Sequence, residues 1–362
     1  MSGNLCTQIH VTCPICKHSF VGTVIKAPEA VCGTGEVFDY LECSACGVVW
    51  LTNPPDDMKK YYENYYSMSM ISGTNKSNFL HRIVQKLTVG GIGCLTRSSI
   101  NRMHAAINRT FGKWWIARAI RDNRGVENYI SPHLCGFSLN ACALLGLGLS
   151  KDASILDYGS GDGEFVEEMF RLGFKNTVGM DPFIEKDLML PSGGMVFSGD
   201  MKGNTHRIGL FDLITLNHSF EHIPNPAEIA TLLLRHLKDD GVIVLRFPNV
   251  GSVHFKQYRE NWWGLHAPRH YFLHTKKSLE EIFVPLGAEI RYVKCDSCYD
   301  HYLYSQEYEL GIYDQSPYSF RRGNNGIFTN SELRYWKKKT RLLNRALVGD
   351  WIVYYIAKKH SD

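Results

Sequence analysis

The residues best suited to chemistry are two carboxylates, Asp157 and Asp181, each at the end of a short apolar run. Three glycines follow the first of them at alternate positions: Gly159, Gly161 and Gly163. A turn this tight needs backbone angles that only glycine adopts at low cost, and the missing Cβ atoms let a ligand lie against the main chain. An acid at the tip of the second strand can accept hydrogen bonds from both hydroxyls of a ribose.

The glycine pattern differs from that of a dinucleotide site, which needs G-x-G-x-x-G facing a pyrophosphate. Here the pattern is D-x-G-x-G-x-G, and Glu164 follows the last glycine. Asp157 would repel a pyrophosphate but suits a sulfonium and an α-amino group. The stretch resembles motif I of class I S-adenosylmethionine (SAM) methyltransferases, with Asp181 as the acid of motif II. The resemblance implies that SAM is the cofactor and that these two acids and the three glycines hold it.

The surrounding pattern predicts an α/β fold with a Rossmann-like sheet. A helix is expected over 165–174, between the two strands that end in the acids. Further strands are expected at 195–200, 211–216, 241–247, 288–293 and 351–357. With the first two strands they would form the seven-stranded sheet of class I methyltransferases, with 351–357 as an antiparallel edge strand.

Three regions are predicted along the chain. Residues 1–55 are expected to form a small zinc ribbon, and 56–150 a tyrosine-rich and basic helical connecting region. Residues 151–362 are expected to form the SAM-dependent methyltransferase domain. An insertion at about 299–349 separates the last two strands and is expected to serve as a substrate cover or an interface.

Two C-x2-C pairs near the N-terminus could bind a metal. Their members are Cys13, Cys16, Cys43 and Cys46. Four thiolates at this spacing can surround a tetrahedral Zn²⁺, and a site with four protein ligands is structural rather than catalytic. Redox pairs or free thiols are the alternatives. Cys295 and Cys298 form a third pair that has no partner pair nearby, so ordinary thiols are expected there.

Candidate site residues cluster where strands end, because open sheets of this kind bind ligands at the carboxyl ends of their strands. Asp200 is expected to contact the adenine amino group. Asn217 and His218 follow the fourth strand and are expected beside the reacting methyl group. Glu221 and His222 come just beyond them.

A second set of polar and aromatic side chains, at 262–274, is typical of a pocket rim. Within it, Arg269 suits a phosphate or carboxylate, His270 is a second base candidate, and Tyr271 is expected to contact the substrate. Tyr65 and Tyr66 belong to a tyrosine cluster with two open interpretations: it lines a substrate pocket, or it packs the ribbon onto the main domain.

Residues 150–290 resemble a methyltransferase family that includes ubiquinone-pathway and sugar-modifying enzymes, on F-D-x-I at 211–214 and E-H-I at 221–223. The ribbon, the tyrosines and this region together resemble nucleotide-sugar C-methyltransferases and relatives from bacterial surface-polysaccharide clusters. In those enzymes a Glu-His pair at this position is implicated in proton abstraction. The resemblance therefore implies an acid/base role for Glu221 and His222; the alternative is that the histidine only shapes the wall.

The charge distribution does not identify the binding partner. The net charge is only +4, but 67–125 carries ten Lys or Arg residues and one acid, Asp122. This stretch is either a solvated helical face or an electropositive surface for a nucleotide-linked sugar, a lipid-linked saccharide, a membrane leaflet or RNA.

Taken together, the sequence predicts a cytoplasmic SAM-dependent methyltransferase with a structural zinc. No secretion signal or membrane-spanning stretch is expected. The expected acceptor is a polar small molecule or glycan precursor, methylated on a sugar oxygen or carbon. The alternatives are an RNA methyltransferase and a non-catalytic scaffold.

Overall fold

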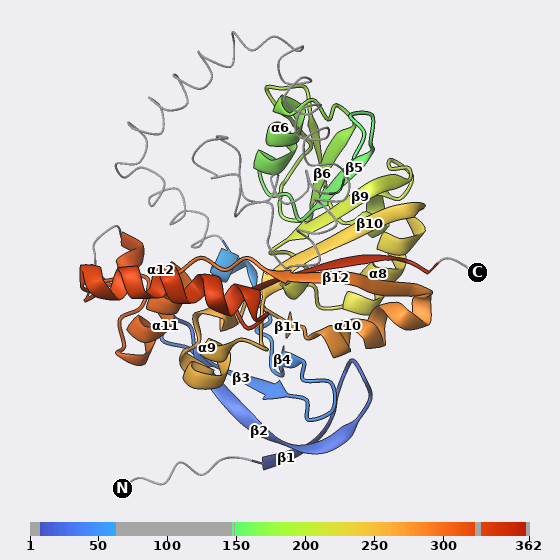
Figure 1. Ribbon diagram of the computed structural model, residues 1–362. Helices are drawn as coiled ribbons and strands as arrows, with labels where there is room; N and C mark the ends of the chain where they lie inside the picture. Colours follow the sequence, from blue (N-terminus) through green and yellow to red (C-terminus); the bar gives the residue numbers. More distant parts are fainter. Residues whose placement is uncertain (1–7, 63–146, 148, 323–326, 360–362) are drawn as a thin grey trace, which may run out of the picture.

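The computed structural model describes residues 8–62, 147, 149–322 and 327–359 (Figure 1). It contains a five-stranded sheet, built largely from N-terminal residues, and an eight-stranded sheet at the centre of the remainder. Most of the predicted connecting region, including its basic stretch and Tyr65 and Tyr66, lies outside the described residues.

The eight-stranded sheet has the strand order β12-β13-β10-β9-β5-β6-β8-β7. Its strands are β5 (Ile155–Tyr158), β6 (Thr177–Asp181), β7 (Leu188–Met189), β8 (Met195–Ser198), β9 (Phe211–Asn217), β10 (Leu237–Pro248), β12 (Ala288–Cys295) and β13 (Trp351–Lys358). The strands from β10 to β8 in this order run parallel, so their carboxyl ends meet at one edge. This is the predicted Rossmann-like α/β sheet, with the short β7 added beside β8.

The strand at the C-terminal end was expected at the edge of the sheet, and this expectation is wrong. β13 lies between β10 and β12 and is antiparallel to both. Residues 352–357 of β13 are all buried, whereas β12 is partly exposed along most of its length. A continuous apolar strand belongs in the interior of a sheet that is covered on both faces, so the less apolar β12 takes the edge.

The helices of the described part of the chain include α6 (Glu164–Arg171), α7 (Met201–Asn204), α8 (Pro226–Arg235), α9 (Val253–Tyr258), α10 (Lys276–Phe283), α11 (Asp300–Glu309) and α12 (Asn330–Arg345). Helices cover both faces of the eight-stranded sheet. Because successive strand residues point to opposite faces, Leu156 and Ile214 pack with α8 and α10, whereas Ile155 and Leu213 pack with α6. Within the described ranges, none of the helices is long and apolar enough to cross a lipid bilayer.

The N-terminal sheet is fastened to the rest of the chain by one of its own strands. In order it contains β1 (Gln8–Thr12), β2 (Ser19–Pro28), β3 (Val37–Glu42), β4 (Val49–Leu51) and β11 (Phe272–Leu273). β11 comes from the predicted pocket rim and pairs antiparallel with β4. The Tyr40 hydroxyl on β3 also donates to the His270 carbonyl at 3.0 Å. The segment that carries Arg269 and His270 is thus held by the N-terminal module.

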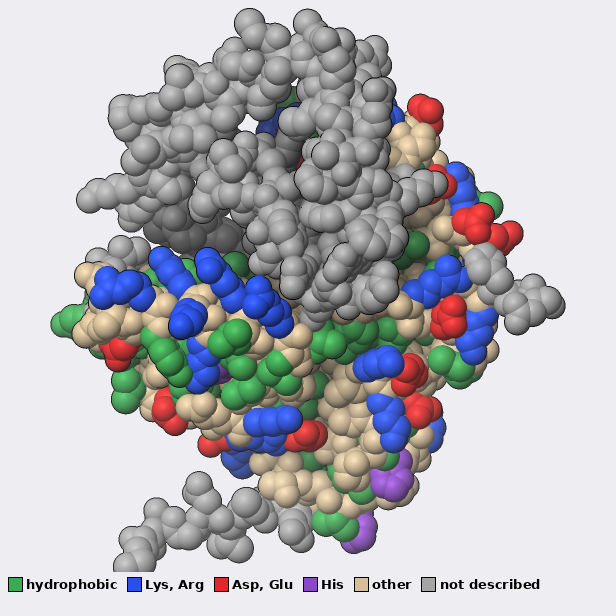
Figure 2. Space-filling model, in the orientation of Figure 1, with side chains coloured by type: hydrophobic (Ala, Val, Ile, Leu, Met, Phe, Trp, Pro, Cys, Tyr) green, Lys and Arg blue, Asp and Glu red, His purple; other side chains and the backbone are tan. Residues whose placement is uncertain are grey.

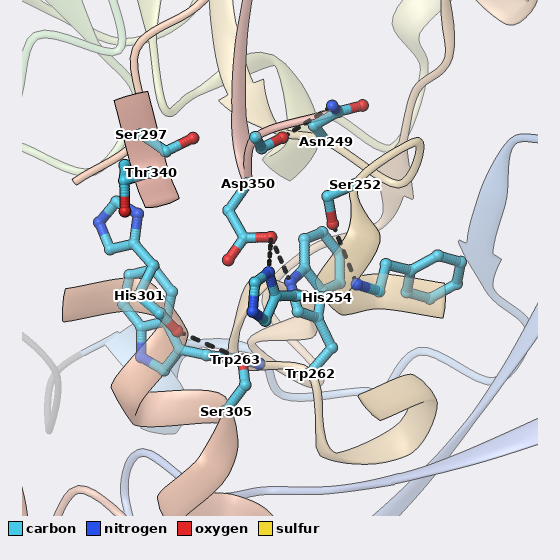
Figure 3. A network of polar contacts seen from close by, with 12 residues as sticks. Asn249, Ser252, His254, Trp262, Trp263, Ser297, His301, Ser305, Thr340 and Asp350 are labelled. Carbon is cyan, nitrogen blue, oxygen red and sulfur yellow. Dashed lines mark hydrogen bonds and ion pairs between the residues drawn. The ribbon is translucent and has the colours of Figure 1, made fainter. Parts of the chain in front are cut away.

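The insertion between β12 and β13 packs against the loop that follows β10, through a buried polar network (Figure 3). Asp350 accepts the indole N–H of Trp262 at 3.2 Å and lies 3.9 Å from Nδ1 of His254. The backbone N–H of Trp263 donates to the hydroxyl of Ser305 on α11 at 3.1 Å. Burial raises the pKa of Asp350 to about 7. These contacts fix α11 beside the cavity described next.

Candidate active site

The glycine turn joins β5 to α6 beside the tip of β6. Asp181 holds this turn, because its Oδ2 accepts the N–H of Gly161 and its Oδ1 accepts the N–H of Phe183, each at 2.8 Å. Gly163 is the N-cap of α6 with a φ of 85°. The carboxylate that was predicted to bind the ribose therefore also shapes the elbow on which the ligand would lie.

Gly159 is required by a neighbouring side chain as well as by its φ of +80°. A Cβ at this position would lie 2.3 Å from the Cβ of Ser219, whose hydroxyl donates to the Tyr158 carbonyl at 2.7 Å. We expect Gly159→Ala to lower the free energy of unfolding by about 3 kcal/mol, from overpacking and backbone strain together. Urea unfolding measures this.

The matched control for that substitution is Gly161→Ala. Gly161 also has a positive φ, +55°, but a Cβ there would meet nothing within 4 Å. The free energy of unfolding of this variant should fall only by the cost of backbone strain at a positive φ, about 1 kcal/mol. Equal losses in the two variants would contradict a role for the contact with Ser219.

A cavity of about 670 Å³ lies at the carboxyl ends of the parallel strands. Its volume is in the range of pockets that enclose small ligands. At one end it is lined by Tyr158, Gly159, Asp181, Phe183, Asp200 and Ser219. At the other it is lined by His218, Glu221, His222, Trp263, His266, Arg269, His270, His301, Tyr304, Arg321 and Trp351. One cavity thus joins the predicted cofactor turn to the predicted acid/base residues.

Glu221 lies at the centre of the second group and is fully buried. Its Oε1 is 3.5 Å from Nδ1 of His218 and 4.0 Å from Nε2 of His270. Neither carboxylate oxygen has a hydrogen-bond partner among the described residues. Burial raises the pKa of Glu221 to about 8. At neutral pH this side chain is therefore mostly a carboxylic acid that holds a proton.

Two histidines beside it present a basic nitrogen. Nδ1 of His222 lies 2.8 Å from the carbonyl of Arg269, and Nδ1 of His270 lies 2.8 Å from the carbonyl of Gly264. Because a carbonyl only accepts, both Nδ1 atoms carry hydrogen, which leaves each Nε2 with a lone pair. Burial lowers both pKa values, that of His222 to about 4. Both rings are therefore neutral at pH 7.

Tyr62, near the start of the predicted connecting region, is a cavity residue that was not among the predicted site residues. Tyr62 lines the cavity, and its hydroxyl lies 3.1 Å from Nδ1 of His222. Its ring stacks on Phe183, with ring centroids 4.7 Å apart. The signal was present in the tyrosine cluster, but the prediction fell on Tyr65 and Tyr66, which lie outside the described residues.

The insertion also reaches the cavity. His301 and Tyr304 on α11 and Arg321 beyond it line the same end of the cavity as Glu221. His301 stacks on Trp263 with an interplanar angle of 7°, and its ring centroid lies 4.0 Å from that of Trp351. No local motif marked these residues, because only the return of the chain from β12 to β13 brings them here.

Three predicted residues point elsewhere. The Asp157 carboxylate is buried and accepts the Thr215 hydroxyl at 2.7 Å, and burial raises the pKa of Asp157 to about 7. Asn217 lies beside it at the end of β9, and its side chain helps to counter that rise in pKa. Tyr271 packs against the cysteine-bearing module. None of the three lines the cavity. Asp200 does, although its carboxylate also caps α7 by accepting the N–H of Gly203.

The four cysteines of the N-terminal module converge. Their sulfur atoms all lie within 4.8 Å of one another. The Cys13 and Cys46 sulfurs are 3.8 Å apart, and those of Cys16 and Cys43 are 3.6 Å apart. Four thiolates around a tetrahedral Zn²⁺, with Zn–S bonds of about 2.3 Å, require sulfur separations of about 3.8 Å. The cluster is compatible with a small zinc ribbon.

This chain is similar to a known family and to several solved structures. Residues 137–293 match the family model of a methyltransferase domain. No curated protein matches the chain. A solved SAM-dependent methyltransferase from Archaeoglobus fulgidus is 20% identical, with 61% of this chain and 93% of that chain covered and a TM-score of 0.38. The plantazolicin methyltransferase BpumL is 15% identical, with 80% and 100% covered and a TM-score of 0.37.

The family match covers the glycine turn, Asp181 and Glu221. Of these residues, Gly159, Asp181 and Glu221 line the same cavity. We conclude that residues 137–293 contain a methyltransferase domain and that the chain is a methyltransferase enzyme.

Proposed function

We propose that this enzyme methylates a polar small molecule or glycan precursor, most favourably on an oxygen or carbon of a sugar. The observation that carries the proposal is the cluster of Glu221, His222 and His270, which shares one cavity with the glycine turn and Asp181. A protonated carboxylic acid and two neutral imidazoles in a buried site suit an acceptor that must lose a proton.

The cofactor end is assigned to the main chain at Gly159 and to the side chains of Asp181 and Asp200. SAM supplies an electrophilic methyl group on a sulfonium. The acids of this end match a ribose and an adenine amino group, which donate hydrogen bonds. The chain's own task is to hold the acceptor in line and to remove its proton.

The proton passes to an imidazole. When SAM is bound at the other end of the cavity it would supply the methyl group, and the acceptor would lose its O–H or C–H proton as it takes up that group. The released proton goes to Nε2 of His222 or His270. The resulting imidazolium is stabilised when Glu221 gives up its own proton towards solvent, since a carboxylate then faces the new charge.

The end of the cavity that Glu221 lines, which is the proposed acceptor end, favours a substrate with a polar ring. Trp263, Tyr304 and Trp351 provide flat apolar faces, and Arg269 and Arg321 provide donors for an anionic or hydroxyl-rich group. Such a mixture of aromatic walls and a few polar groups is typical of sites for small polar ligands.

Incubation with methyl-labelled SAM tests this function. The protein is given separate pools of nucleotide-linked sugars, lipid-linked saccharides and RNA, and each pool is analysed by mass spectrometry. Label is expected in a saccharide pool. Label in RNA alone would overturn the proposal.

We also propose that the cysteine cluster holds a structural Zn²⁺. Cys13→Ser should reduce the metal content from about one Zn²⁺ per chain to about none, because a structural site needs all four thiolates. Since β4 of this module pairs with β11 next to His270, methyl transfer should fall as well. Elemental analysis and the labelling assay measure the two effects. Cys298→Ser is the control and should retain the metal; equal zinc content in both variants would contradict the assignment.

A further inference from the structure

Helix α12 packs one side against the protein and presents a charged side to solvent. Trp336 and Thr340 are buried, whereas Arg334, Lys338 and Arg341 are exposed. The exposed cations recur at spacings of three and four, so they lie along one stripe of the helix. The only acid on α12, Glu332, is occupied in a capping box with Thr329.

This stripe is not neutralised locally. Arg334, Lys338 and Arg341 form no ion pair with any other residue in the described part of the chain. Lys337 extends the same exposed side, with its Nζ atom 4.8 Å from the centroid of the Tyr299 ring. A dense row of cations on one helix repels itself, so it is expected to have an anionic partner.

Exposed apolar side chains lie next to the stripe. Tyr335 is 55% exposed, Leu342 is 56% exposed and Leu347, just past the helix, is 39% exposed. Tyr335 and Leu342 are seven residues apart, which places them on one line of the helix adjacent to the cations. Figure 2 shows blue and green side chains side by side over the α12 region.

We propose that this face of α12 is a docking surface for an anionic lipid bilayer. Clusters of Lys and Arg on a helix are attracted to anionic headgroups, and adjacent Leu and Tyr side chains gain by entering the interface. RNA would satisfy the cations, and a base could stack on Tyr335. The aliphatic Leu342 and Leu347 would gain nothing from RNA but would be buried in a bilayer interface, so the bilayer is the better match.

The position of α12 links this surface to the cavity. The same insertion supplies His301, Tyr304 and Arg321 to the acceptor end. Docking through α12 would therefore bring a membrane next to the part of the enzyme that contacts the acceptor. This goes beyond the proposed function, since the surface does not depend on which acceptor is methylated.

Vesicle co-sedimentation tests the proposal with the full chain. Vesicles of phosphatidylcholine with phosphatidylglycerol should bind the enzyme, and vesicles of phosphatidylcholine alone should not. The variant R334Q/K338Q/R341Q should lose at least about tenfold in affinity. Leu342→Ser should weaken binding with little change in its salt dependence, whereas the wild-type affinity should fall as salt rises.

Two controls match these changes. K175Q/K186Q/R235Q removes three exposed cations elsewhere, and Met189→Ser removes an exposed apolar side chain on β7; both should bind like the wild type. SAM binding confirms that each variant is folded. Vesicle binding that the α12 substitutions leave unchanged would overturn the proposal. So would a wild-type protein that binds poly(U) RNA through the α12 cations but does not bind either kind of vesicle.

Discussion

Asp181→Ala should weaken SAM binding by about 100-fold or more. The carboxylate already accepts the N–H groups of Gly161 and Phe183, and Asp181 lines the cavity, where its remaining lone pairs would accept the hydroxyls of a ribose. Charge-assisted hydrogen bonds contribute about 1.5–3 kcal/mol each, so losing two of them accounts for an effect of this size. Isothermal titration with SAM and with S-adenosylhomocysteine measures it.

Two further variants separate ligand contact from support of the turn. Asp181→Asn keeps an oxygen for the N–H of Gly161 and should bind with intermediate affinity. Asp187→Asn, which alters an exposed acid paired with Arg207, should bind SAM normally. Unchanged affinity in Asp181→Ala, with the fold intact by thermal unfolding, would refute the cofactor assignment.

The sheet and its cofactor edge could be predicted from sequence because their signals are local. Glycine at 159, 161 and 163 is demanded by positive φ angles within a single turn, and the acids follow directly from their strands. The start of α10 is likewise local, because the side chain of Thr275 caps it by accepting the N–H of Ser278. Such features depend on neighbours in the chain, which a sequence displays.

The acceptor side could not be predicted in the same way, because it is assembled from distant segments. Tyr62 contacts His222 across 160 residues of sequence, and His301 contacts Trp263 only after the insertion has folded back. The placement of Asp157 under the turn also depends on β9, whose Thr215 takes up its carboxylate. Sequence order carries no signal for these pairings.

Glu221→Gln should lower kcat by about 100-fold to 10,000-fold while leaving SAM affinity unchanged, because the amide keeps the shape but cannot exchange a proton. Glu221 is buried and mostly protonated at neutral pH, so the neutral amide should fit without unfolding the site. Glu280→Gln, an exposed acid paired with Lys276, is the control and should retain full activity. A normal kcat in Glu221→Gln would leave the histidines to act without a carboxyl partner.

The same substitution should change how stability depends on pH. Burial raises the pKa of Glu221 from 4.5 to about 8, so between these values the folded state keeps a proton that the unfolded state releases. The favourable contribution of protonated Glu221 to the free energy of unfolding is fully present below pH 4.5 and is lost as pH rises through about 8. Glutamine does not titrate, so Glu221→Gln should gain stability relative to the wild type across this window, on the order of a few kcal/mol. Denaturant unfolding at pH 5, 7 and 9 measures the difference. If the difference in free energy of unfolding between the variant and the wild type were the same at all three pH values, Glu221 would already be ionised in the folded enzyme. An ionised Glu221 holds no proton, so it could not act as the carboxylic acid of the cluster.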